Sequence, residues 1–136
     1  DVGRMVETDN INDMYKFKTP ALRNVSLTAP YGHNGAYPTL KSIIKHHLNP
    51  IKMNKNWKPE YANLPKAPWL EEIDFVTFSD KREQDRILSS IDIQPVELND
   101  IEIDQLVSFL ESLTGRSGNQ RPLGKPDKVP SGLSID

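Results

Sequence analysis

The chain has 136 residues, of which 36% are hydrophobic and 26% charged, and its formal net charge is −2. This balance excludes a strongly basic surface of the kind that binds nucleic acid or anionic lipid, and no apolar run approaches the ~20 residues that a membrane-spanning helix needs. Because the chain contains no cysteine, its own residues can form neither a disulfide nor a thiolate metal site.

Residues 17–40, FKTPALRNVSLTAPYGHNGAYPTL, gather many conformationally special residues into one short segment. Pro30 lacks a backbone donor and pushes the residue before it towards extended geometry, which disfavours a helix. Gly32 and Gly35 bracket His33, and glycine permits backbone conformations or close approaches that other residues do not. The segment is therefore predicted to be a rigid loop that presents His33 to a ligand or partner.

A helix is predicted next, from Thr39 to Leu48, with Thr39 as its N-cap and Pro50 as a stop beyond its end. The helical period gives it an apolar face made of Leu40, Ile43, Ile44 and His47. His46 lies about 100° round the helix from His47. The simplest interpretation of a histidine on such a face is a core or interface residue, and the alternative is a haem-iron ligand.

The middle of the chain carries weaker patterns. Residues 49–68 are rich in lysine, asparagine and proline and are expected to form a surface excursion. Three aromatic residues should pin this excursion to an apolar surface, namely Trp57, Tyr61 and Trp69. Residues 76–78 predict a brief extended piece, and residues 79–90 predict a short polar helix.

A second clear helix is predicted from Asp100 to Leu113. Asn99 is its N-cap, Glu102 completes a capping box, and Gly115 is placed to end it. Its apolar stripe consists of Ile103, Leu106, Val107, Leu110 and Leu113. Residues 116–136 are rich in proline and glycine and predict an extended arm, so the expected fold is mainly α with long loops.

The segment 17–40 closely resembles a run in the C-terminal haem domain of the bacterial di-haem cytochrome c peroxidase family, which includes the methylamine-utilisation di-haem enzymes. The matching residues are Phe17, Lys18, Thr19, Pro20, Leu22, Arg23, Asn24, Val25, Leu27, Thr28, Ala29, Pro30, Tyr31, His33, Gly35, Thr39 and Leu40. A looser resemblance extends to LVSFLESLTG and to VPSGLSID near the end of the chain. The resemblance implies a partial cytochrome c-type fold over residues 1–115, followed by a C-terminal tail over residues 116–136.

Members of that family attach each haem through a Cys-x-x-Cys-His motif, which this chain lacks. We therefore expect the 136 residues to be the C-terminal part of a longer precursor or one component of a split enzyme. Haem c would then be attached through a segment that precedes this chain or lies on another chain, and that segment would supply the proximal histidine.

The resemblance also suggests roles for single residues. His47 falls fourteen positions after His33, where the family carries the methionine or tyrosine that is the distal axial ligand of the C-terminal haem. Imidazole is a competent iron ligand, so His47 would give a bis-histidine haem. Met53 is a weaker alternative ligand, because it lies beyond Pro50. A zinc site formed by His33, His46 and His47 is weaker still, because adjacent histidines project apart on a helix.

His33 itself corresponds to a hydrogen-bonding or structural residue of the loop between the two haems. The backbone carbonyls of Thr28 and Pro30 resemble those that help to bind calcium between the haem domains, and a rigid turn without metal is the alternative. Lys18 and Arg23 could pair with haem propionates, or they could be ordinary surface charges.

The implied activity is the reduction of hydrogen peroxide in the periplasm, with electrons from a small cytochrome c or cupredoxin. This chain would line the electron-relay haem, and no residue in it is assigned a catalytic role. The family also allows a homodimer. The alternatives are the oxidation of a protein substrate, a non-catalytic electron-transfer cytochrome component, and a haem-free structural or interaction subunit.

Overall fold

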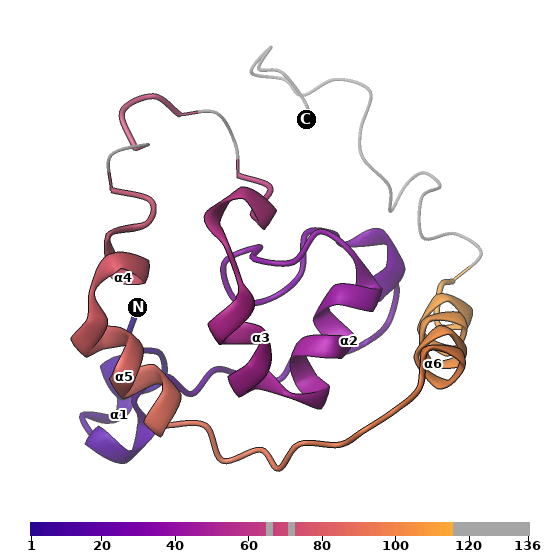
Figure 1. The fold of residues 1–136 in the computed structure, drawn as a ribbon, viewed down its shortest axis with the longest axis horizontal. Coiled ribbons are helices and arrows are strands. Elements are labelled where there is room, and N and C mark those ends of the chain that lie inside the picture. Colours follow the sequence, from indigo (N-terminus) through magenta and orange to yellow (C-terminus); the bar gives the residue numbers. More distant parts are fainter. Residues whose placement is uncertain (65–66, 71–72, 116–136) are drawn as a thin grey trace.

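The computed structural model describes residues 1–64, 67–70 and 73–115 and shows a mainly helical chain (Figure 1). The α-helices are α1 (Met5–Thr8), α2 (Leu40–Leu48), α3 (Pro50–Asn56), α4 (Val76–Ser79), α5 (Lys81–Ser89) and α6 (Asp100–Ser112). Short 3₁₀ turns occur at η1 (Ile11–Asp13), η2 (Val25–Leu27) and η3 (Pro59–Tyr61). These ranges contain isolated bridges but no strand, so the mainly-α prediction is confirmed and a partial cytochrome c-type fold is consistent with it. The predicted arm at residues 116–136 lies outside the described residues.

Helices α2 and α3 form a tight pair at the centre of the molecule (Figure 1). Thr39 caps α2 as predicted, with a reciprocal capping box to Ser42. Pro50 does lie beyond the end of α2, but it also begins α3, where the Asn49 side chain accepts a hydrogen bond from the Lys52 amide. The prediction of an irregular excursion directly after residue 49 was therefore wrong, because proline at the first helical position is already set for a helix.

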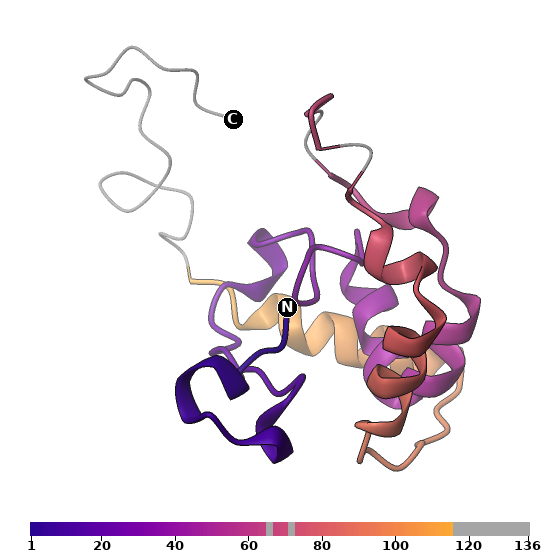
Figure 2. The same cartoon turned by 90° about the vertical axis from the view of Figure 1, so that its left-hand side faces the viewer.

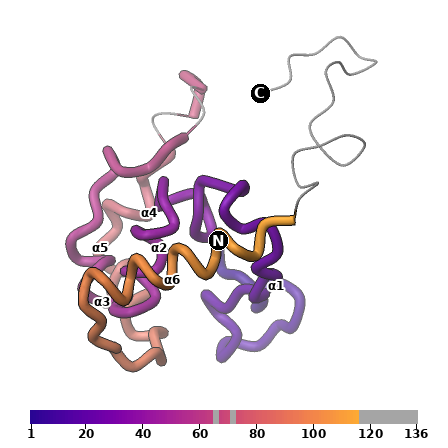
Figure 3. Tube along the Cα trace, turned by 90° about the vertical axis from the view of Figure 1, so that its right-hand side faces the viewer, coloured from indigo at the N-terminus to yellow at the C-terminus, as the bar shows by residue number. Residues whose placement is uncertain are grey.

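Helix α6 runs antiparallel to α2, and Figure 3 shows it crossing the molecule from the α3 side towards the α1 side. Two ion pairs define this arrangement: Lys41 Nζ lies 2.6 Å from Asp104, and Lys45 Nζ lies 3.6 Å from Asp100. Between the helices lies Ile103, which is only 4% exposed. The predicted capping box at Asn99 forms. Of the predicted apolar stripe, Ile103 is buried and Val107 and Leu110 pack against the core cluster, whereas the expectation for Leu106 was wrong, because its side chain is 38% exposed.

The N-terminal segment is a separate small lobe (Figure 2). Helix α1 and η1 are joined by a bridge between Gly3 and Lys16, and Gly3 has a φ of +66°. A Cβ at Gly3 would lie only 2.5 Å from the Lys16 carbonyl oxygen, so a side chain does not fit there. The Tyr15 hydroxyl donates a hydrogen bond to Glu83 of α5, which ties this lobe to the later helices.

The later helices match the predictions only in part. The polar helix predicted at residues 79–90 is confirmed as α5, and Asp80 caps it by accepting from the Arg82 and Glu83 amides. The extended piece predicted at residues 76–78 was wrong, because this stretch forms the single turn α4 instead. Of the aromatic residues expected to pin the middle segment, Trp57 packs on the core, whereas Trp69 is 79% exposed.

The apolar core is thin. Its buried members are Tyr31, Tyr37, Leu40, Ile44 and Ile103, and none of the described side chains is completely buried. Large apolar side chains remain exposed on several helices, including Ile101 and Phe109 of α6. None of the described helices has the length and hydropathy that a membrane span requires.

Candidate functional site

The loop between η2 and α2 is closed by a backbone pair. Tyr31 and Tyr37 exchange two hydrogen bonds, of 2.7 and 3.0 Å, and both side chains are buried. Gly32 and Gly35 have φ values of +86° and +71°, which only glycine adopts freely. The predicted loop is therefore a closed turn with His33 between its two glycines, and its rigidity stays a prediction.

His33 contacts the N-terminal segment rather than helix α2. Its Nε2 lies 2.9 Å from an Asp1 carboxylate oxygen, and its ring stacks on Phe17 with 3.7 Å between ring centroids. The side chain is nonetheless exposed. His33 thus has a hydrogen-bond partner and a stacking partner within this chain, and its role between the two haems stays a prediction.

His46 is the histidine that the fold holds in place. Its Nδ1 lies 2.9 Å from the Tyr37 hydroxyl, so the loop and the last turn of α2 are joined through these two side chains. Burial, and secondarily the neighbouring His47, lowers the pKa of His46, while burial raises the pKa of Tyr37. Both shifts favour a neutral pair in which the phenol donates to the imidazole.

His47 is exposed, which corrects the expectation that it belongs to the buried stripe of α2. The helical period does place it on the side of Leu40 and Ile44, both of which are buried. Its neighbours in the last turn have partners, because Lys45 pairs with Asp100 and His46 with Tyr37. The imidazole of His47 is left uncovered at the end of an otherwise apolar stripe.

The two alternative metal sites find no support in the geometry. Met53 lies within α3 and packs against the core cluster formed by Tyr31, Tyr37 and Leu40. Among the residues that the structure describes, no group of three or more histidine, aspartate or glutamate side chains could hold a metal ion. The three histidines are accordingly not gathered into a zinc site.

The other residues singled out in the sequence lie on the exposed loop. Within the described ranges, no hydrogen bond is donated to the carbonyl oxygen of Thr28 or of Pro30, so both remain available to a cation. Lys18 lines a shallow hollow beside the N-terminal lobe, and Arg23 is exposed just before η2. The structure does not bring Lys18 or Arg23 into contact with His47.

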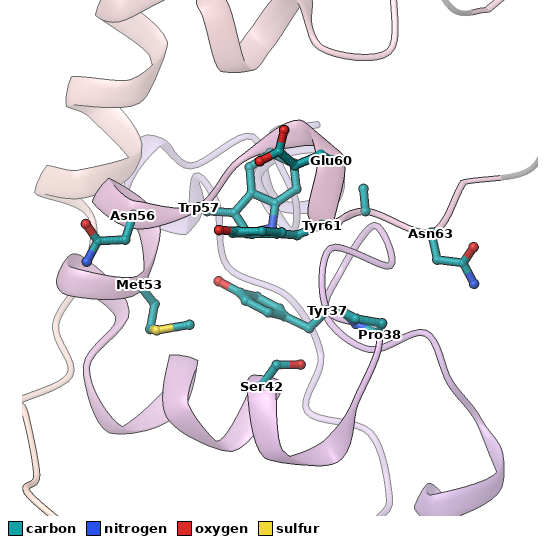
Figure 4. Close-up of a pocket in the computed structure, with 10 residues that line it drawn as sticks. Tyr37, Pro38, Ser42, Met53, Asn56, Trp57, Glu60, Tyr61 and Asn63 are labelled. Carbon is teal, nitrogen blue, oxygen red and sulfur yellow. The ribbon is translucent and has the colours of Figure 1, made fainter.

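Sequence reasoning missed an open aromatic pocket of about 690 Å³ between the loop, α3 and η3 (Figure 4). The lining residues are Tyr37, Pro38, Ser42, Met53, Asn56, Trp57, Glu60, Tyr61, Ala62 and Asn63. Trp57 is fixed there because its Nε1 donates a 2.9 Å hydrogen bond to the Ala36 carbonyl. The sequence did contain a signal for this pocket, because several aromatic residues occur between residues 31 and 61. Only the fold shows that Tyr37, Trp57 and Tyr61 line the same pocket.

Comparison with known proteins identifies relatives of this chain, although no family model and no solved structure matches it significantly. The chain is 38% identical over 106 residues to the methylamine utilization protein MauG of Paracoccus denitrificans, covering 74% of this chain and 23% of that protein. It is 51% identical over 45 residues to the cytochrome c peroxidase Ccp of Escherichia coli, covering 33% of this chain and 10% of that protein. It is also 38% identical over 58 residues to the cytochrome c551 peroxidase of Nitrosomonas europaea, covering 43% of this chain and 17% of that protein.

The homologues of this chain are MauG and cytochrome c peroxidases, the di-haem family. The resemblance seen in the sequence is thereby confirmed at the level of the family. The chain spans no more than 23% of the length of these three relatives. The roles of single residues in this MauG and peroxidase-like chain remain predictions.

Proposed function

We propose that this chain forms one wall of a haem pocket in a di-haem, peroxidase-like protein, and that His47 is an axial ligand of the haem. The observation that carries the proposal is the exposed imidazole of His47 at the uncovered end of the apolar stripe of α2. A haem iron needs a nitrogen donor that is free to reach it, and the exposed imidazole of His47 is such a donor. His47 therefore fits as an axial ligand, whereas Leu40 and Ile44 are buried in the core of this chain, so further apolar walls of the pocket would come from another part of the protein.

The remaining residues of α2 set the position of the ligand. The capping box at Thr39 fixes the start of the helix, and the hydrogen bond from Tyr37 to His46 fixes its last turn. His47 is consequently presented from a helix held at both ends. The chain contributes no cysteine, so haem c would be attached through a haem-bearing N-terminal part or a separate chain of the same protein.

The haem supplies one-electron storage and transfer when it is bound. In the proposed role this chain surrounds the electron-relay haem of a periplasmic enzyme that reduces hydrogen peroxide with electrons from a small redox donor, a cytochrome c or a cupredoxin. Exposed apolar residues on the outer side of α6, including Phe109, support burial against a further part of such an assembly. Imidazole in place of methionine would lower the potential of this haem.

Calcium is a further part of the proposal. The carbonyl oxygens of Thr28 and Pro30, which accept no hydrogen bond from the described residues, are suitable ligands for this cation, and the remaining ligands would come from outside the chain. Lys18 and Arg23, on the exposed loop, are suited to pair with the haem propionates.

Two alternative functions rest on specific observations. An imidazole at the ligand position would saturate the iron and leave no open site, which favours a non-catalytic electron-transfer cytochrome component. The absence of cysteine favours a haem-free structural or interaction subunit. In a further alternative, similar to MauG, the substrate that is oxidised is a protein, and His47 would have the same role as a haem ligand.

The test uses the complete protein isolated from its native source, with intact mass, denaturing haem stain, absorption and electron paramagnetic resonance spectra. We expect haem staining on a larger or separate polypeptide and a low-spin ferric signal. His47→Ala, introduced in the native host, should convert the low-spin signal of one haem to high spin. His47→Met should restore a low-spin haem at a higher potential.

His46→Asn is the matched control, because its side-chain carbonyl can accept the Tyr37 hydrogen bond in place of Nδ1 and so keep the last turn of α2, and it should keep the low-spin signal. A colourless preparation of this mass alone would exclude the haem-ligand role and favour the haem-free subunit. An unchanged low-spin spectrum in His47→Ala would remove His47 from the iron. Peroxide consumption by the intact protein then separates the peroxidase from the non-catalytic cytochrome.

A further inference from the structure

The aromatic pocket defined above opens to solvent beside helix α2. Tyr37, which lines it, bonds His46, whose ring packs edge-on against that of His47. Figure 4 shows the rings of Tyr37 and Tyr61 on either side of the opening, with Trp57 next to Tyr61 and Met53 beneath. Tyr37 forms the base of the pocket and is held in place, because its side chain is only 7% exposed. Tyr61 forms one side of the pocket, and 48% of it is exposed. The pocket thus combines a rigid base with an accessible aromatic side.

The chemistry of this lining favours a cation. The faces of tyrosine and tryptophan rings carry negative electrostatic potential, and several such rings around one space attract alkylated ammonium groups. The Met53 thioether adds a polarisable surface for methyl groups. Glu60 supplies the one formal charge among the lining residues, and this charge is negative.

We propose that the aromatic pocket binds a small organic cation that carries an alkylated ammonium group. The cation would lie between Tyr37 and Tyr61, against Trp57, with Glu60 at the rim as its counter-charge. Glu60 has a neighbouring lysine, because Lys58 Nζ lies 3.6 Å from its carboxylate. Both side chains of that pair are mainly exposed, so the pair is weak and a bound cation can compete with it.

A neutral apolar ligand is the competing explanation for a pocket of this kind, because aromatic and thioether groups also bind hydrocarbon surface. The two explanations differ in one property, which is the dependence of binding on the charge of the ligand. Choline and its neutral carbon isostere, in which a tert-butyl group replaces the trimethylammonium group, have nearly the same shape and differ in that charge. Comparing them separates cation–π attraction from simple burial of methyl groups.

The experiment is a ligand-observed nuclear magnetic resonance titration of the whole protein with each of the two compounds. We expect choline to bind about tenfold more tightly than the isostere, which corresponds to a typical cation–π contribution. Tyr61→Phe keeps the ring and should keep choline binding, whereas Tyr61→Ala should abolish it. Glu60→Gln should weaken choline binding about threefold and leave binding of the isostere unchanged.

Lys58→Ala is a second control, because it removes the competing cation without altering the lining and should not weaken choline binding. Equal affinity for choline and the isostere would overturn the proposal, and so would the absence of choline binding. Full choline binding by Glu60→Gln together with Tyr61→Ala would overturn it as well. If Tyr61→Ala fails to fold, Glu60→Gln and the isostere still provide the test. None of these outcomes depends on the haem-ligand role of His47.

Discussion

Replacement of Ile103 by alanine should loosen helix α6 from α2 and thereby release the helix that carries His47. Ile103 is 4% exposed, the lowest fraction among the buried core residues. It lies between the two ion pairs that join α2 and α6. Its burial therefore contributes to this helix pair together with Val107 and Leu110, which pack against the core cluster.

The expected loss of stability follows from this burial. Removing the buried atoms of isoleucine costs about 2–5 kcal/mol, depending on how far the surroundings collapse into the cavity. Because the core is thin and none of its described side chains is fully enclosed, we expect the lower part of this range, about 2–3 kcal/mol. Ile103→Val removes one methylene group and should cost about 1 kcal/mol.

The assay is chemical denaturation followed by helical circular dichroism, with free energies of unfolding compared at equal denaturant slope. Ile101→Ala is the matched control, because it makes the same substitution on the same helix where the side chain is 72% exposed. This control should change the free energy of unfolding by less than about 0.5 kcal/mol. Equal losses for Ile101→Ala and Ile103→Ala would refute the assignment of the inner face of α6.

Two further predictions concern the tyrosines beneath the loop. Tyr37→Phe keeps the buried ring but leaves His46 Nδ1 without its donor, so we expect a loss of about 1 kcal/mol and shifted His46 ring resonances; unshifted resonances would contradict the hydrogen bond. Burial raises the pKa of both Tyr31 and Tyr37 above the ordinary value of 10.0, so the unfolded chain releases these phenolic protons first. This contribution to the free energy of unfolding should therefore be fully present below that pH and be lost as the pH rises above it. The loss should be less steep in Tyr37→Phe. A free energy of unfolding that stays constant in a series of denaturation experiments at alkaline pH would disprove this coupling.

The two principal helices could be predicted because their signals are local. Capping residues Thr39 and Asn99 satisfy the first free amides of α2 and α6, and the following apolar periods give each helix a face to bury. The closed loop around His33 was equally predictable, since its glycines adopt positive φ values that other residues avoid. These features depend on neighbours within a few residues.

Helix α3 was missed because a proline such as Pro50 is compatible both with the end of one helix and with the start of the next. Proline ends one helix and equally starts another, and the outcome depends on whether the next turn can pack. Here Met53 and Trp57 pack against the loop and α2, which makes the second helix favourable. The single turn α4 was misjudged in the same way, because short apolar runs do not specify a helix or a strand by themselves.

The sequence by itself determined the resemblance to the di-haem family, the main helices, the closed loop and the absence of thioether attachment to this chain, because each of these depends on residue identity or local spacing. Only the tertiary structure decided which histidine of α2 is enclosed and which is free. His46 is held by Tyr37, which comes from the preceding loop, whereas the side chain of His47 is exposed. The convergence of Tyr37, Trp57 and Tyr61 around one pocket likewise depends on long-range packing, which no local pattern encodes.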